Sequence, residues 1–68
     1  MEYNNSQARE AINEWIHDKM HRRIMKLRFV HGYTMEEIAG EVHMSDRQVK
    51  RIVKKNEDIL FRHMKNPV

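Results

Sequence analysis

Apolar residues recur along the first half of the chain at the three- and four-residue spacing of helix faces. This spacing predicts one helix over about residues 6–17 and a second over about residues 19–31. Asp18 is a candidate N-cap between them, Gly32 can end the second helix, and the two helices could also run on as one. The apolar positions of the first helix are Ala8, Ile12, Trp15 and Ile16, and those of the second are Met20, Ile24, Leu27 and Val30 or His31.

A capping box predicts the start of a third helix, over residues 35–43. The Thr34 hydroxyl can accept a hydrogen bond from the Glu37 amide, while the Glu37 carboxylate reaches back to the Thr34 amide. The buried face of this short helix is expected to consist of Ile38, Ala39 and Val42.

A fourth helix is predicted over residues 46–62. Ser45 offers an N-cap, and Asp46 lies in the first turn, where the helix dipole favours an acid. Residues 63–68, which contain the only proline, are expected to fray. The positions at helical spacing on the inner face are Val49, Ile52, Val53, Asn56 and Leu60.

The composition favours one all-α domain of three or four helices over residues 1–68. Two glycines, no repeat, no linker and no strict apolar–polar alternation argue against a sheet. The absence of cysteine excludes a disulfide framework, a thiol nucleophile and a thiolate metal site. No stretch has the pattern of a signal peptide or a membrane span, so we expect a cytoplasmic protein with no membrane partner.

The second half of the chain fits the packing pattern of a helix-turn-helix motif. This motif needs a small residue where its two helices cross, apolar residues beside it, and an apolar residue that plugs the turn. The residue before the plug is commonly a glycine with a left-handed backbone, but here it is His43, which tolerates a positive φ better than most residues. The positions that fit are Ala39 as the small residue, Ile38 and Val42 beside it, Met44 as the plug, and Val49 and Ile52 in the following helix.

The net charge of +3 hides a strong partition of charge along the chain. Residues 19–31 carry five bases and no acid, residues 35–46 carry four acids and no base, and residues 47–55 carry five bases and no acid. If the two basic segments meet in the fold, they focus a positive potential on one face. A solvated helix surface is the alternative explanation of these charges.

The outward face of the predicted fourth helix carries side chains that can contact a DNA major groove. Arg and Lys pair with guanine O6 and N7, and Gln pairs with adenine N6 and N7. Arg47, Gln48 and Arg51 are the candidate base contacts because they lie in the first two turns of the helix, whereas Lys54 and Lys55 are candidate phosphate contacts. Ser45 and the free amides at the helix start can also hold a phosphate. The full set of candidate DNA-binding residues is Thr34, Ser45, Asp46, Arg47, Gln48, Lys50, Arg51, Lys54 and Lys55.

The role of Asp46 has two explanations at this stage. Its carboxylate could accept a hydrogen bond from cytosine N4, or it could only favour the helix dipole.

A family resemblance rests on three stretches, LRF at 27–29, GYTMEEIA at 32–39 and MSDRQVKRI at 44–52. Together they resemble region 4 of the sigma-70 family of bacterial sigma factors, and small phage-type transcriptional activators built on that domain. The resemblance implies that the final helix reads an upstream promoter element and that the domain docks onto the flap of RNA polymerase. The DNA-reading positions that it implies are Asp46, Arg47, Gln48, Lys50 and Arg51.

The final helix also departs from the family pattern. The family often has an Arg-Glu-Arg-x-Arg-Gln character where this chain has Asp-Arg-Gln-Val-Lys-Arg, so the DNA sequence that it reads need not be the usual one.

Metal binding and catalysis are not expected. His17 and His21 have the i, i+4 spacing of zinc ligands, but no third ligand lies nearby in the sequence. Glu36 and Glu37 are adjacent, so they point to different parts of a helix surface and cannot act as an acid–base pair. No nucleophilic triad or glycine-rich phosphate loop is present, and we predict a protein that is not an enzyme and has no cofactor.

These observations favour a sequence-specific regulator of transcription that binds double-stranded DNA in a bacterial or phage-infected cell. Contact with RNA polymerase and formation of a homodimer are left open. One alternative is an adaptor or inhibitor of a host factor that uses the apolar first helix, and another is a small DNA-packaging subunit. Trp15 is expected in the core, whereas the methionines are expected as gap-fillers or as an exposed contact surface. These methionines are Met20, Met25, Met35 and Met64.

Overall fold

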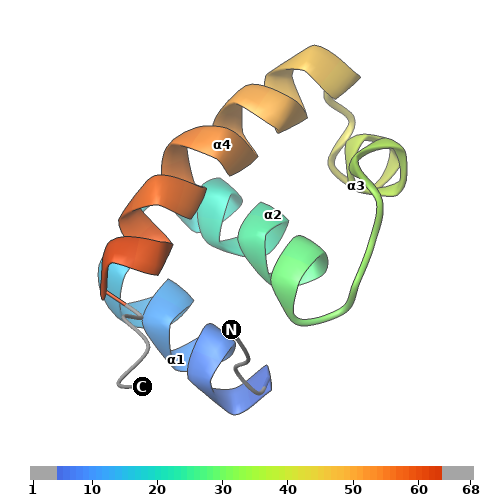
Figure 1. The fold of residues 1–68 in the computed structure, drawn as a ribbon. Coiled ribbons are helices and arrows are strands. Elements are labelled where there is room, and N and C mark those ends of the chain that lie inside the picture. The colour runs from blue at the N-terminus through green and yellow to red at the C-terminus, as the bar shows by residue number, and fades with distance from the viewer. Residues whose placement is uncertain (1–4, 64–68) are drawn as a thin grey trace.

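The computed structural model describes residues 5–63, which form four helices joined by short loops (Figure 1). The predicted all-helical fold is confirmed. The longest helix, α4, packs across α2, while α3 lies near the start of α4 and α1 lies near its end. Met64 and the rest of the expected frayed tail lie outside the described residues, and His63 is still helical. The helices are α1 (Asn5–Trp15), α2 (Lys19–Phe29), α3 (Met35–Val42) and α4 (Asp46–His63).

Asp18 separates α1 from α2, which therefore do not run on as one helix. Its backbone is extended, with φ −76° and ψ 127°, and its carboxylate accepts from the amides of Met20 at 2.9 Å and His21 at 3.1 Å. Helix α1 ends at Trp15, two residues earlier than predicted, and residues 16–18 connect it to α2. The hydrogen bond from the His21 amide is the main cause that lowers the pKa of the Asp18 carboxyl, and the bond from the Met20 amide lowers it further. The charged Asp18 carboxylate therefore stabilises the fold at neutral pH, and this contribution to the free energy of unfolding is lost as the pH falls through the lowered pKa.

The loop after α2 is held by backbone and arginine hydrogen bonds. The helix ends at Phe29, two residues earlier than expected, and Gly32 takes a positive φ of 76°. Arg28 Nη1 donates to the Tyr33 carbonyl at 2.9 Å, and the Tyr33 amide donates to the Leu27 carbonyl at 2.9 Å. These bonds fix the direction in which the chain enters α3.

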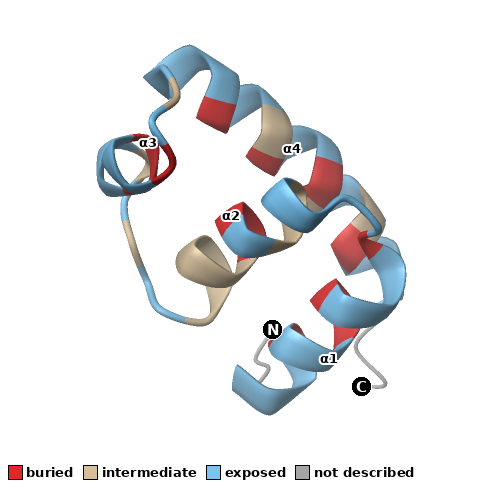
Figure 2. Cartoon of the chain, turned by 180° about the vertical axis from the view of Figure 1, so that it is seen from behind, coloured by how far each residue is buried: buried red, intermediate tan, exposed pale blue. Residues whose placement is uncertain are grey.

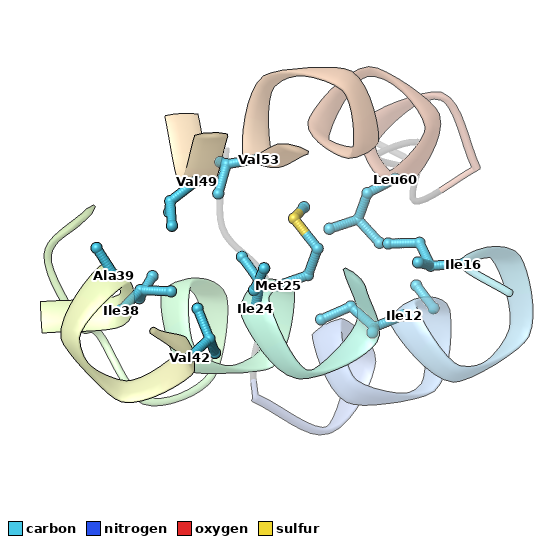
Figure 3. Close-up of a cluster of buried hydrophobic side chains, with 11 residues drawn as sticks. Ile12, Ile16, Ile24, Met25, Ile38, Ala39, Val42, Val49, Val53 and Leu60 are labelled. Atoms are coloured by element: carbon cyan, nitrogen blue, oxygen red, sulfur yellow. The ribbon is translucent and has the colours of Figure 1, made fainter. Parts of the chain in front are cut away.

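One hydrophobic core connects all four helices (Figure 3). Ile24 and Met25 of α2 point towards α4, and both are fully buried. Because each helix contributes to the same cluster, no helix has a core of its own. The buried cluster consists of Ala11, Ile12, Ile16, Ile24, Met25, Ile38, Ala39, Val42, Val49, Val53 and Leu60.

The prediction that Trp15 lies in the core is wrong. Trp15 is 39% exposed rather than buried, and its ring stacks on His63 with the ring centroids 3.7 Å apart. Met20 is 37% exposed, whereas Met25 is fully buried. The face of α2 that meets α4 is centred between Ile24 and Met25, so the helix is rotated away from the predicted row of Met20, Ile24 and Leu27. Figure 2 shows the resulting exposed outer surfaces of α1 and α2.

A buried polar pair lies within the α2–α4 interface. Asn56 is only 3% exposed, and its Nδ2 donates to the Ile52 carbonyl at 2.8 Å and lies 3.1 Å from His21 Nδ1. Since Nδ2 is a donor, Nδ1 of His21 acts as the acceptor and the ring proton of a neutral imidazole lies on Nε2. Asn56 thus lies on the buried face of α4, and both hydrogens of its amide nitrogen have an acceptor.

The two methionines of α2 provide a matched test of this packing. Met25→Ala is expected to lower the free energy of unfolding by about 2–5 kcal/mol because it leaves a cavity in the core. Met20→Ala, the same substitution on an exposed side chain, is expected to change it by less than about 0.5 kcal/mol. Urea unfolding followed by circular dichroism measures both, and equal losses for the two variants would contradict the observed rotation of α2.

Candidate nucleic-acid interface

The turn between α3 and α4 has the geometry of a helix-turn-helix motif. His43 adopts the left-handed conformation expected at this position, with φ 58° and ψ 45°. The amides of His43 and Met44 both donate to the Ala39 carbonyl, which closes the end of α3. Met44 is half-buried and packs against the core, as expected of the plug residue. The turn therefore fixes the angle at which α4 leaves α3.

The first turn of α3 is fixed by the predicted capping box. The Glu37 amide donates to Thr34 Oγ1 at 3.1 Å, and the Thr34 amide donates to Glu37 Oε1 at 2.8 Å. The capping bond uses a lone pair of the Thr34 oxygen, so the hydroxyl keeps its hydrogen for another acceptor. Thr34 is exposed and can offer that hydrogen to a phosphate.

A second reciprocal cap fixes the first turn of α4, in which Ser45 is the predicted N-cap and Gln48 is a partner that was not predicted. The Gln48 amide donates to Ser45 Oγ at 3.1 Å, and Gln48 Oε1 accepts from the Ser45 amide at 3.2 Å and from its hydroxyl at 3.3 Å. This is a capping box with glutamine at the third helical position. The Ser-x-x-Gln spacing at residues 45–48 was the signal that could have revealed it.

The outward face of α4 is basic. Within residues 5–63, its five bases make no ion pair, and all five are exposed. Val49 and Val53 are buried on the opposite side of the same helix, which turns the basic side chains outwards. Asp46 is exposed in the first turn, beside this face. The five bases are Arg47, Lys50, Arg51, Lys54 and Lys55, and we call them the α4 basic face.

The basic residues of α2 do not join the α4 basic face. Arg22 Nη2 donates to the His17 carbonyl at 3.2 Å, and Arg23 Nη2 lies 3.5 Å from Glu41 Oε1 of α3. Because Ile24 and Met25 of α2 point towards α4, Lys19, Arg23 and Lys26 lie on the far side of α2. Arg28, near the end of α2, is engaged with the Tyr33 carbonyl. The two basic segments thus form separate surfaces instead of one combined face.

A comparison with protein families identifies the family to which this helix-turn-helix motif belongs. The family described as Sigma-70, region 4, matches residues 18–55, more than half of the chain. The chain belongs to this family. Membership in the sigma-70 region 4 family implies a non-catalytic helix-turn-helix domain that binds DNA in connection with transcription. Comparisons with curated proteins and with solved structures give no match.

The region 4 match covers α2, α3 and the first half of α4, and so includes every candidate DNA-binding residue. It leaves out α1 and the end of α4. None of the helices within residues 5–63 is long and apolar enough to cross a membrane. Over the same residues, no group of three or more His, Asp or Glu side chains could hold a metal ion.

Substitutions at Gln48 test the second cap of the region 4 domain. Gln48→Ala removes both side-chain bonds to Ser45 and is expected to lower the free energy of unfolding by about 0.5–1 kcal/mol. Gln48→Glu keeps the accepting oxygen and adds a negative charge near the positive end of the helix dipole, so its stability should equal or exceed that of the wild type. Urea unfolding distinguishes these outcomes, and an unchanged midpoint for Gln48→Ala would show that the cap contributes nothing.

Proposed function

We propose that this region 4 domain is a sequence-specific regulator of transcription that binds double-stranded DNA through the start of α4. The α4 basic face carries the proposal, because five exposed and unpaired bases lie on the helix that follows a helix-turn-helix turn. The protein would act in the cytoplasm of a bacterium, including one infected by a phage. Its DNA sequence would be set by residues 46–51.

Arg47 and Arg51 are the main base contacts in this proposal. They are separated by one helical turn and lie on the same outward side of α4, so both can enter one major groove. An arginine offers two donors to guanine O6 and N7, which favours guanines at the contacted positions. Lys50 and Asp46 flank this pair, where Lys50 can donate to a base or a phosphate and Asp46 can accept from cytosine N4.

Gln48 is a base contact of a restricted kind. Its Oε1 accepts from the amide and hydroxyl of Ser45, so the side chain approaches a base edge with Nε2 as a donor only. The two-bond pairing of glutamine with adenine needs the amide oxygen as well, and it would break the cap. Single acceptors such as guanine O6 or thymine O4 are therefore the preferred partners of Gln48.

The phosphate contacts flank the base contacts. Lys54 and Lys55 lie one to two turns further along α4, where the helix leaves the groove and passes the DNA backbone. The Thr34 hydroxyl at the start of α3 can donate to the same backbone. Ser45 contributes chiefly through the amides of the first turn that its cap holds in place, because its hydroxyl is engaged with Gln48.

A docking role is the second candidate function, and three exposed apolar side chains favour it. Trp15 is 39% exposed, Met20 37% and Phe61 38%. Large apolar side chains on the surface often mark contacts with protein partners. RNA polymerase is the partner that the family resemblance implies, and an adaptor without DNA binding, or a homodimer, would use similar side chains.

Two single substitutions separate a base contact from a phosphate contact. Arg47→Ala is expected to weaken binding to the preferred site by about 1–3 kcal/mol and to relax the preference at one base pair. Lys54→Ala is expected to weaken binding to all sequences alike and to reduce the salt dependence by about one unit of slope. Binding sites selected from random duplexes, followed by titrations with both variants, test this assignment. Equal losses on all sequences for both variants would contradict it.

The salt dependence of a gel shift separates the DNA-binding regulator from a pure adaptor. The regulator should retard duplex DNA at 50 mM salt and lose about a hundredfold in affinity by 200 mM if roughly four phosphates are contacted. A pure adaptor should not retard DNA at either concentration. The double variant Lys54→Glu, Lys55→Glu is the control, because it should strongly weaken retardation without disturbing the core.

A further inference from the structure

A second basic surface lies in an open groove between α1 and α2. The groove has a volume of about 410 Å³. Four of its lining residues are cations of one helix, and Leu27 is the single apolar lining residue. The lining is therefore mostly polar and positively charged. The polar lining residues are Asn13 of α1, Lys19, Arg22, Arg23 and Lys26 of α2, and His31, which follows α2. We call this surface the α2 groove.

The α2 groove faces away from the α4 basic face. Figure 3 shows Ile24 and Met25 pointing from α2 towards α4, and a helix turns by about 100° per residue. Lys19, Arg23 and Lys26 therefore lie on the side of α2 opposite these two residues. The residues of α4 that pack on α2 are likewise opposite the bases of α4. The two basic surfaces thus lie on opposite sides of the α2–α4 layer, so one straight duplex held by α4 does not reach the groove.

The positive charge of the groove is only partly compensated. Glu41 of α3 lies 3.5 Å from Arg23, in an exposed pair that is worth little in water. Asp18 at the start of α2 is engaged in capping. Arg22 is held in place by the His17 carbonyl, and its Nε is buried with no hydrogen-bond partner among the described residues. The guanidinium of Arg22 is therefore fixed beside the groove, where its charge attracts an anion nearby.

The side chains of the groove suit a nucleic-acid backbone better than a protein surface. Protein interfaces are depleted of charge at their centres and enriched in aromatic anchors, whereas DNA interfaces are polar and strongly positive. Four of the residues that line the α2 groove are cations, and His31 is its single aromatic lining residue among the described residues. Lys19 and Lys26 are two turns apart, about 10 Å along the helix axis, so the row of cations can follow several phosphates of one strand.

We propose that the α2 groove binds the phosphate backbone of a second DNA segment, separate from the duplex held by α4. One molecule would then bridge two duplexes, or two distant parts of one DNA, from opposite sides of the domain. The binding of DNA in the groove depends only on its own cations. The bridging rests on the proposed function of α4 as well.

The test is the capture of a fluorescent duplex on beads that carry an unlabelled duplex of the same sequence. Wild-type protein should bring the free duplex to the beads. Lys19→Glu, Lys26→Glu should lower this capture about tenfold or more, because two attractive contacts become repulsive, while the affinity for a single duplex in solution changes by less than about threefold. The matched control Arg9→Glu, Arg62→Glu changes the net charge equally at exposed sites outside both surfaces and should capture as the wild type does.

Four outcomes would overturn the proposal. The groove variant could capture as well as the wild type, or it could lose capture and single-duplex affinity to the same extent, which would mean that both surfaces hold one duplex. Its loss of capture could coincide with the dissociation of a dimer, measured by light scattering without DNA, which would make the groove an interface between copies. Polyglutamate of matched charge could displace the second duplex as well as DNA does, which would assign the groove to an acidic protein segment.

The α4 variant keeps the two proposals apart. If Lys54→Glu, Lys55→Glu binds a single duplex as the wild type does, the function proposed for α4 fails. Adding Lys19→Glu, Lys26→Glu to that variant then tests the groove alone. A further drop in residual DNA binding at low salt supports the groove, and an unchanged residual affinity overturns it.

Discussion

The packing of α4 across α2 is the constraint on which the rest of the structure depends. The helix that carries the bases is 18 residues long, and its inner side is buried from Val49 to Leu60. Most of the stability of a helix in a protein comes from the packing of its apolar face rather than from the helix itself. The contacts of α4 with α2, α3 and α1 therefore hold it, and the Asn56–His21 pair adds one polar contact of fixed direction to an otherwise apolar interface. The same packing separates the α4 basic face from the α2 groove.

The local signals of the sequence predicted much of the fold, because each has a short-range physical cause. The caps at Asp18 and Thr34 depend on residues two or three positions away, and both are formed as predicted. The left-handed backbone at His43 was also predicted, because the chain must turn there to begin α4 at the angle of a helix-turn-helix motif. The candidate DNA-binding residues all lie within the segment that matches the sigma-70 region 4 family, although their individual roles remain proposals.

The errors concern features that only tertiary packing decides. A helix period of 3.6 residues leaves the centre of an apolar face uncertain by one position, so Met20 and Met25 were both compatible with burial until α4 fixed the rotation of α2. Trp15 could not be assigned from its own helix, since its partner is His63, at the far end of the described chain. The α2 groove was equally hidden, because a row of bases along a sequence does not reveal which side of the domain it occupies.

The region that matches the family is smaller than the unit that folds. Residues 18–55 exclude α1 and the end of α4, yet Ile12, Ile16 and Leu60 are buried in the common core. When only a fraction of the molecules is folded and able to bind, the measured affinity for a ligand is reduced by that fraction. Helix α1 therefore affects how much of the protein can bind DNA, although it carries none of the candidate DNA contacts of residues 34–55. Under the proposed function, substitutions in α1 would change how much of the DNA is occupied without changing the DNA sequence that α4 reads.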